Sequence, residues 1–515
     1  MPRSSLSLSR RGLLASAAGL GVAALAGRSG FAATPTAGGV LRYATLGLDT
    51  SDPHRHTGSI AVQQCYVEAL TSIAADGSVE PFLAERFTVS PDGRNYRFEL
   101  RPGVTFHNGD PLTAADVVAN IERVKSKVKG GWLASAMKLV DGAAADGPNV
   151  VTLSLSKPYA PLLNLFSELW ILSPKSDGWA ETIKTPIGTG PFTFGTWVPK
   201  VKLTAPAYRN YWRSGEPHLS AIEFDLGDGT DKALALRAGD LHVANVERDT
   251  VEALVASGKV DIKALKDTAW FSIAFNNRKP RPPFDDPRVR SAIALAVDKA
   301  AIMKFVGGAE GVVTNQLVAP GNVYFDQALH DADPFAKPDL AKAKALLAEA
   351  RVKPEDHTIE FVSWVGPYPQ IVVQMVRKLG FKVNHVALDD IGAQKRLGQY
   401  DWDMNAMSSG PRADLFLRWV RLMTDGPNPV LWGGIQDAEL DRTITAAVEE
   451  PDLARRKAIY LDATRRVAEK VYFVVLGHAP DLVAVAKTVQ GYEPGFTWAC
   501  HWASGGVARA ALVAA

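Results

Sequence analysis

The chain has 515 residues, of which 47% are hydrophobic and 22% charged, an ordinary composition for a globular protein. Its formal net charge of +2 is close to neutral and argues against nucleic acid or a membrane surface as partner. A chain of this length exceeds what one hydrophobic core can organise, so we expect two or three domains.

Residues 1–33 have the pattern of an export signal. Arg10 and Arg11 precede a mildly apolar run, and the small residues Gly30 and Ala32 follow where a signal peptidase would cleave. SRRGLL is similar to the twin-arginine consensus, which predicts export in the folded state. The apolar run is shorter than the roughly 20 residues of a membrane span, so we expect no membrane insertion. The alternative is a disordered basic N-terminus of a cytoplasmic protein.

Cleavage of this signal would change the charge balance. It removes four arginines and no acid from a total of 57 basic and 55 acidic residues, which leaves 53 basic residues. We therefore expect a soluble, slightly acidic mature protein in the periplasm.

The next part of the chain is rich in predicted strands. VLRYATL, from Val40, predicts a strand, and IAVQQCYVEALTSI, from Ile60, has apolar residues on one face and predicts a helix. Asp-Gly pairs at 76–77 and 92–93 separate short apolar runs and predict hairpin turns. We expect an antiparallel, sheet-rich subdomain here.

The stretch FHNGDPLTAADVVANIER, residues 106–123, concentrates polar groups that resemble a catalytic or metal site. However, Asn108-Gly109 predicts a turn, and Thr113 and Asp116 have the spacing of a capping box before apolar residues at helical intervals. Each polar residue except His107 therefore has a structural role, and the stretch predicts a turn followed by a helix.

Helix and strand patterns alternate through the rest of the chain. DKALALRAGDLHVANV predicts a helix, a turn at Gly239 and a strand. An apolar strand begins at Ala269, and a long helix is expected from Asp286. The alternation returns between residues 339 and 388, which predicts a second α/β lobe with a mainly parallel sheet.

Several blocks in a fixed order carry a family resemblance. They are LAERFTVSPDGRNYRFELRPGVTFHNGDPLTAADVVANIERV at 83–124, SDPH at 51–54, IGTGPFTF at 187–194, YRNYW at 208–212, LRAGDLHV at 236–243 and FNNRKPRPPFDDPRVRSAIALAVDK from Phe275. Together they resemble the family 5 extracellular solute-binding proteins of ABC importers, over nearly all of residues 40–500. This group includes binders of dipeptides, oligopeptides, nickel, opines, haem and glutathione.

The resemblance implies an α/β fold: a bilobed periplasmic-binding-protein type II clamp with an additional β-rich subdomain in the first lobe. The implied parts are lobe I (40–69, 186–269 and 479–515), the subdomain (70–185) and lobe II (270–478). The chain would cross between the lobes near Ala269 and Ala479, and ligand between the lobes would stabilise the closed state by hinge motion.

The resemblance also implies the partners and one candidate disulfide. We expect a monomer that binds a small-molecule ligand, docks transiently on an ABC permease of the inner membrane, and carries no cofactor and no metal. Cys65 and Cys500 both fall in lobe I and are candidates for a disulfide; the alternative is two buried thiols.

Relatives place ligand-binding groups on the segments that enter the second lobe and on loops at the ends of its strands. The residues predicted to bind ligand here are Trp270, Phe271, Asn276, Trp364, Tyr368, Met407, Ser408, Ser409, Arg412, Asp414 and Trp432. Strand side chains alternate, so one of Trp270 and Phe271 is expected to face the cleft and the other the core. His54 and His56 have a spacing that suits a metal but lack further ligands, so a solvated loop is the preferred interpretation.

Residues 407–414 depart from the peptide-binding relatives. Those proteins have a Trp, an aspartate that grips the peptide α-ammonium, and a further acid, which correspond here to Ser408, Pro411 and Asp414. Arg412 stands beside the lost aspartate, and its guanidinium suits a carboxylate or a phosphate. This predicts an opine, a modified or acidic peptide, or a sugar acid as ligand; the alternative is that Arg412 points to solvent.

Other function classes leave no motif in the sequence. Gly-x-Ser-x-Gly, His-Glu-x-x-His, Cys-x-x-Cys and a phosphate-binding loop are all absent. We predict that the protein is not an enzyme, with a secreted hydrolase as the least favoured alternative. A ligand sensor or a protein-binding module with the same fold stays open.

Overall fold

The computed structural model describes residues 38–45, 47–55, 60–129, 131–227, 229–410, 412, 414–426, 429–495 and 506–513. The predicted export signal, Cys500 and Pro411 lie outside this part of the chain, and Cys65 is buried. Within this part, no helix combines the length and the apolar character that crossing a membrane requires.

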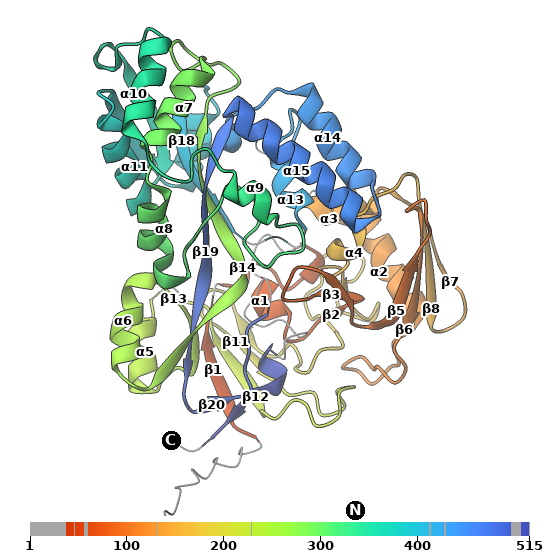
Figure 1. The fold of residues 1–515 in the computed structure, drawn as a ribbon. Helices are drawn as coiled ribbons and strands as arrows, with labels where there is room; N and C mark the ends of the chain where they lie inside the picture. The colour runs from red at the N-terminus through yellow and green to blue at the C-terminus, as the bar shows by residue number, and fades with distance from the viewer. Residues whose placement is uncertain are drawn as a thin grey trace, which may run out of the picture. The chain divides into compact units, whose positions relative to one another are not determined.

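An eleven-stranded sheet runs through the molecule (Figure 1). Ten strands follow one another in the order β10 (Trp197–Val198), β11 (Lys202–Pro206), β12 (Ala221–Asp225), β1 (Val40–Ala44), β13 (Val243–Val246), β19 (Phe473–Ala486), β14 (Val260–Phe275), β18 (Met404–Ser409), β16 (Thr358–Trp364) and β17 (Lys382–Leu388). The short β15 (Val312–Val313) pairs with β19.

The sheet is mixed, so the prediction of a mainly parallel sheet in the second lobe is only half right. β16 runs parallel to β17 and β18, whereas β14 is antiparallel to both β18 and β19. β14 carries the chain into this half of the sheet and β19 carries it back, so these two neighbours must run in opposite directions.

The long strands β14 and β19 lie side by side along the molecule (Figure 1). Ala269 and Ala479, the two positions expected at the chain crossings, are partners in this pair. The register shifts between Ala264 and Thr268, close to this point. Irregular pairing of this kind bends and twists a strand locally.

A separate four-stranded antiparallel sheet forms the predicted β-rich subdomain. Its order is β5 (Ala84–Val89), β6 (Asn95–Leu100), β8 (Val150–Leu155) and β7 (Val140–Ala145), and α2 (Ala114–Lys127) packs against it. Both predicted Asp-Gly turns form: Gly77 and Gly93 have φ of 83° and 67°, values that glycine adopts readily. The predicted capping box forms as well, because the Thr113 N–H donates to Asp116 Oδ2 at 2.9 Å.

Two of the expected helices are wrong in extent. The helix expected from Ile60 ends at Gln63 (α1, Ile60–Gln63), and the chain continues into β2 (Glu68–Ala69) and β3 (Thr71–Ile73). Residues 62–73 are all buried, including polar ones such as Gln63 and Glu68, so the one-sided apolar pattern of the segment does not correspond to a solvent-facing helix.

The long helix expected from Asp286 is two helices, α7 (Pro287–Ala296) and α8 (Lys299–Gly307). The break occurs because the Asp298 side chain accepts from the Ala301 N–H at 2.9 Å and caps α8. The remaining short strands are β4 (Val79–Pro81), β9 (Trp170–Ile171), β20 (Val489–Gln490) and β21 (Ala511–Leu512).

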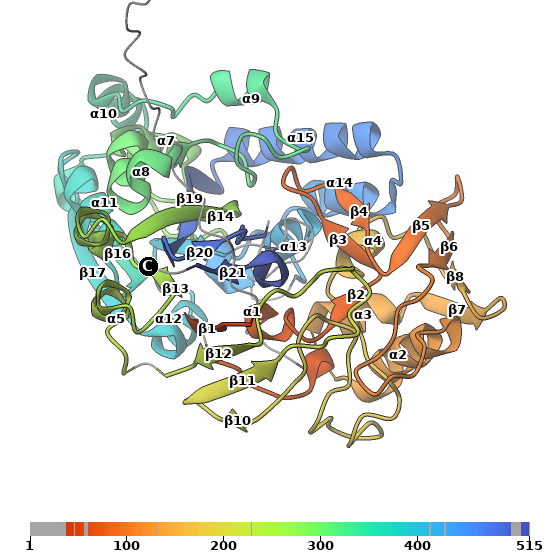
Figure 2. The same cartoon turned by 90° about the horizontal axis from the view of Figure 1, so that it is seen from below.

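The other α-helices lie in the connections between strands. They are α3 (Gly131–Met137), α4 (Leu162–Leu165), α5 (Lys232–Ala238), α6 (Val251–Ala256), α9 (Gln327–Asp331), α10 (Leu340–Glu349), α11 (Pro367–Arg377), α12 (Asp390–Leu397), α13 (Phe416–Trp419), α14 (Ala438–Glu449) and α15 (Leu453–Lys470). Figures 1 and 2 both place α14 beside the subdomain that contains α3 and α4.

Candidate functional site

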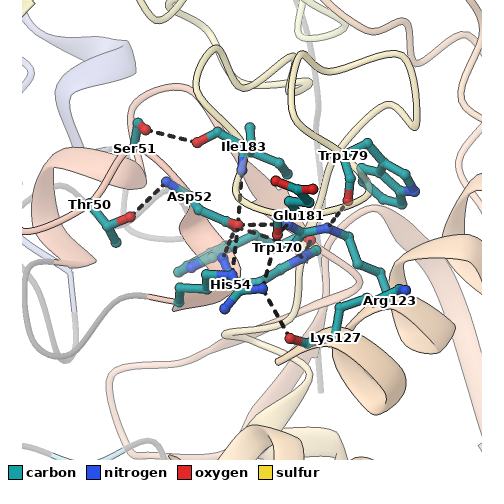
Figure 3. A network of polar contacts seen from close by, with 11 residues as sticks. Thr50, Ser51, Asp52, His54, Arg123, Lys127, Trp170, Trp179, Glu181 and Ile183 are labelled. Carbon is teal, nitrogen blue, oxygen red and sulfur yellow. Dashed lines mark hydrogen bonds and ion pairs between the residues drawn. The ribbon is translucent and has the colours of Figure 1, made fainter. Parts of the chain in front are cut away.

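The SDPH motif and the end of the signature helix α2 meet in a buried ion pair (Figure 3). Arg123 donates from Nη1 to Asp52 Oδ1 at 3.2 Å and from Nη2 to Oδ2 at 2.6 Å. The Ile183 N–H donates to the same Oδ2 at 3.1 Å, and the guanidinium lies 5.2 Å from the ring centre of Trp179. The two charged side chains are 2% and 0% exposed, so the pair joins three separate chain segments without water.

His54 belongs to the same network and is neutral. Its Nδ1 lies 2.7 Å from Arg123 Nη1, which can only donate, and its Nε2 lies 2.7 Å from the Trp170 carbonyl, which can only accept. The proton is therefore on Nε2. The prediction of a solvated loop is wrong for His54, which is buried, and His56 lies outside the described residues. Among the described residues, no group of three His, Cys, Asp or Glu side chains is placed to hold a metal.

Four of the predicted ligand residues lie in one hydrophobic cluster. Trp270 stacks on Trp432 with ring centres 4.6 Å apart, and Met407 is buried with them, while Trp364 packs against the cluster from a partly buried position. Asn276 is also buried, and its amide nitrogen donates to the Tyr400 and Trp402 carbonyls at 3.1 and 2.8 Å.

Phe271 lies in a second cluster. Its ring and the Tyr368 ring pack edge to face with their centres 5.4 Å apart. The Tyr368 hydroxyl has no hydrogen-bond partner among the described residues. Trp270 and Phe271 thus belong to different clusters, as expected for neighbours on a strand.

The segment after β18 lines a pocket of about 850 Å³. One wall comes from the subdomain through α3, Lys157 and Tyr159, and the other comes from α13, the short helix η5 (Val420–Leu422) and α14. Arg412 is the one predicted ligand residue that lines it. The prediction of a site near residue 412 therefore coincides with a cavity, although most of the other predicted residues lie elsewhere.

Direct contacts hold the two walls of this pocket together. The Ala160 N–H donates to the Val448 carbonyl at 2.7 Å, and Tyr159 meets Phe416 edge-on at 6.0 Å. Farther away, the Val323 N–H donates to the Asp76 carbonyl in the β3–β4 hairpin at 3.0 Å. The subdomain therefore contacts the second half of the chain at two separated points.

Two buried carboxyl groups lie close to Arg412 in space or in sequence. Burial raises the pKa of Glu168 to about 8, against the opposing charge of Arg412, and Glu168 Oε2 has no partner among the described residues. Burial also raises the pKa of Asp414, although Arg456 opposes this. Asp414 Oδ1 accepts from the Phe416 N–H at 2.7 Å.

The sequence did not indicate three of the residues around Arg412. They are Tyr159, Glu168 and Arg421. Arg421 donates from Nη1 to the Ser409 hydroxyl at 3.2 Å. The preceding residue, Ser408, is half-buried. No local pattern could have revealed Tyr159 and Glu168, because they approach Arg412 from more than 240 residues away in sequence.

Comparisons with known proteins place the chain among transport-associated binding proteins. A family model described as bacterial extracellular solute-binding proteins, family 5 Middle, matches residues 78–424. The glutathione-binding protein GsiB of Salmonella typhi is 27% identical over 351 residues, which cover 66% of this chain and 67% of that protein.

Two solved structures illustrate the shared fold. The ABC transporter substrate-binding protein CtaP of Listeria monocytogenes superposes with a TM-score of 0.81 at 19% identity, covering 92% of this chain and 99% of CtaP. AgaA of A. tumefaciens R10, solved with agropinic acid, gives a TM-score of 0.71 at 23% identity, covering 93% of this chain and 99% of AgaA. The predicted fold class, a bilobed α/β binding protein, is confirmed by such neighbours.

Proposed function

Because the chain belongs to the bacterial extracellular solute-binding proteins of family 5, we propose that it captures a small polar organic solute between two lobes for an ABC import system. The observation that carries the proposal is the pocket at Arg412, whose two walls come from different parts of the chain. A site built in this way is completed by closure and opened by separation of its walls.

We propose that the lobes follow the boundaries expected from the sequence. Lobe I comprises 40–69, 186–269 and 479–515, with the subdomain 70–185 attached, and lobe II comprises 270–478. The pairing of Ala269 with Ala479 supports a hinge at this place, and so does the register shift before Thr268. A small change in twist at two adjacent strands would separate the pocket walls.

We propose that ligand contact comes from the accessible members of the predicted set. These accessible members are half-buried, so a solute could reach them after modest movement: Phe271, Trp364, Ser408 and Arg412. Trp270, Met407 and Trp432 are fully buried, so we leave them out of the proposed contacts. Two relatives favour an acidic solute, since glutathione and agropinic acid both carry carboxyl groups.

We further propose that residues 1–33 direct folded export to the periplasm, where the mature monomer docks on an inner-membrane permease. A periplasmic location agrees with the extracellular family. Expression of the full chain in a Gram-negative host, followed by fractionation, tests this: a shorter protein in the periplasm is expected. Its retention in the cytoplasm when Arg10 and Arg11 are both replaced by Lys would establish the route.

Solute binding itself is tested by a thermal-shift screen of the purified mature protein against peptides, opines, sugar acids and metal ions. A solute at a hundredfold excess over its dissociation constant stabilises the folded state by about 2.7 kcal/mol. Mass spectrometry of small molecules that co-purify with the protein identifies the natural solute. If no compound raises the melting temperature and none co-purifies, the proposed function is wrong.

A further inference from the structure

Arg421 brings a second guanidinium to the wall of the pocket that Arg412 lines. It lies in η5, half-buried, and its recorded hydrogen bond goes to the neutral Ser409 hydroxyl. No carboxylate of the described residues pairs with Arg421. Burial first, and then the positive charges of Arg412 and Arg418, lower the pKa of Arg421 to about 10. The group therefore stays charged at neutral pH, but next to other positive charges.

Two acids that line this pocket, Asp425 and Asp441, offset part of its positive charge. Asp425 is exposed, and Asp441 Oδ1 accepts from the Thr424 N–H at 3.0 Å. Buried Glu168, with its pKa raised by burial to about 8, is mainly neutral at pH 7. On the opposite wall, Lys157 pairs with Glu449 at 3.5 Å, so its charge is balanced. The charges that act most on Arg421 itself, those of Arg412 and Arg418, are both positive.

Much of the remaining lining is apolar. Leu139 lies on the subdomain side, and Phe416, Val420, Met423 and Val448 lie on the other. Such a surface gains free energy by covering hydrocarbon, at about 25 cal/mol for each Å² removed from water. The arginines therefore favour an anionic group of a ligand, and the apolar wall favours a hydrocarbon part of the same ligand.

We infer that this pocket binds an organic anion whose carboxylate or phosphate group pairs with Arg421 and Arg412 and whose apolar part lies on Phe416, Leu139 and Val448. This rests on the proposed function and names the class of solute. Guanidinium groups bond both head groups through paired N–H donors, which makes Arg421 a specificity-determining residue. A peptide with a single ammonium and a single carboxylate is disfavoured relative to one with an excess of carboxylates, because Arg412 and Arg421 offer no partner for an ammonium.

The experiment uses the mature protein and measures affinity by calorimetry. The probes are N-acetylphenylalanine, its neutral amide N-acetylphenylalaninamide, and phenyl phosphate. We expect at least one anion to bind and the amide to bind at least about tenfold more weakly, because a charge-assisted hydrogen bond contributes about 1.5–3 kcal/mol. Comparison of the two anions distinguishes a carboxylate from a phosphate preference.

Variants then assign the effect to Arg421. Arg421→Gln should weaken binding of the preferred anion by about tenfold to a hundredfold, and Arg421→Lys should restore part of it. Arg465→Gln is the matched control: it removes the same charge from an exposed, Asp462-paired arginine on α15 and should leave affinity unchanged.

Three results would overturn the inference: equal binding of the amide, no binding of either anion, or unchanged anion affinity in Arg421→Gln. If peptides with neutral or positive net charge raise the melting temperature while neither anion binds, the proposed function stands and this inference fails. If the wider screen finds no solute at all, both fail together.

Discussion

Two arginines, Arg123 and Arg421, are withdrawn from water in the same molecule but are treated in opposite ways. Arg123 pairs with Asp52 through two hydrogen bonds and stacks on Trp179. Arg421 has a neutral hydroxyl as its recorded partner and lies near two further arginines. A buried charge without a counter-charge costs several kcal/mol of folding free energy. A buried charged side chain that stabilises the fold is therefore expected to have a partner of opposite charge. We therefore interpret Arg123 as a residue that stabilises the fold and Arg421 as one that is available to bind a ligand.

Removal of Arg123 should have the largest effect. In Arg123→Met the Asp52 carboxylate stays buried without its partner, and the free energy of unfolding should fall by about 3–5 kcal/mol. Urea denaturation followed by circular dichroism measures the loss. As a control, Arg55→Met removes a contact 3.3 Å from Asp52 at a more exposed position and should cost less than about 1 kcal/mol. Equal losses in the two variants would show that Arg123 is not the central partner.

The pKa of Glu168 is shifted in the opposite direction to that of Asp52. Its pKa is raised by burial from 4.5 to about 8, so the folded state holds a proton that the unfolded state releases. Its cost to stability is therefore absent below about pH 4 and grows as pH rises through the interval up to about 8. At pH 8.5 the free energy of unfolding of Glu168→Gln should exceed that of the wild type by several kcal/mol, since each unit of pKa shift corresponds to about 1.36 kcal/mol, and at pH 4 the two should be equal. A difference that does not vary with pH would contradict this.

The Asp52 carboxylate should show the reverse pH dependence. Burial by itself would raise its pKa, but the hydrogen bonds from Arg123 and Ile183 and the charge of Arg123 hold it below the usual value. Its contribution is complete above the unfolded pKa of about 3.9 and is lost as pH falls through the lower folded pKa. We therefore expect part of the free energy of unfolding to be lost as the pH falls below about 4. Urea titrations of Asp52→Asn should lack this part of the acid dependence, and an unchanged acid profile would count against it.

Arg421→Gln should change the free energy of unfolding the least of these variants. The variant loses one hydrogen bond but also removes repulsion from Arg412 and Arg418, so the free energy of unfolding should change by less than about 0.5 kcal/mol. The same denaturation experiment as for Arg123→Met measures it. A loss close to that of Arg123→Met would mean that Arg421 supports the fold and is not available to a ligand.

Local features of the fold were predictable because they depend on neighbours in sequence. The Asp-Gly turns at Gly77 and Gly93 and the capping box at Thr113 follow from the conformational preferences of a few adjacent residues. The strand from Val40 follows in the same way. The expected helix from Ile60 failed because burial of the whole segment by other parts of the chain overrides its local pattern.

The candidate site was predictable only at Arg412, where a change of residue type stands out against a family pattern. Trp270, Met407 and Trp432 were expected at the ligand, but their aromatic and apolar character suits a core equally well, and the structure buries them. Residue type alone does not distinguish these two environments.

Sequence patterns and the family resemblance were therefore enough to predict the fold class, the turns and caps, and one unusual arginine. Which charged groups meet depends on the tertiary fold. Asp52 and Arg123 form an ion pair although they are 71 residues apart in the sequence. Glu168 and Arg412 are also distant in the sequence, and yet their charges interact. Whether a buried charge stabilises the fold or awaits a ligand depends on the groups that surround it in space, because electrostatic energy depends on distance and solvent access rather than on separation along the chain.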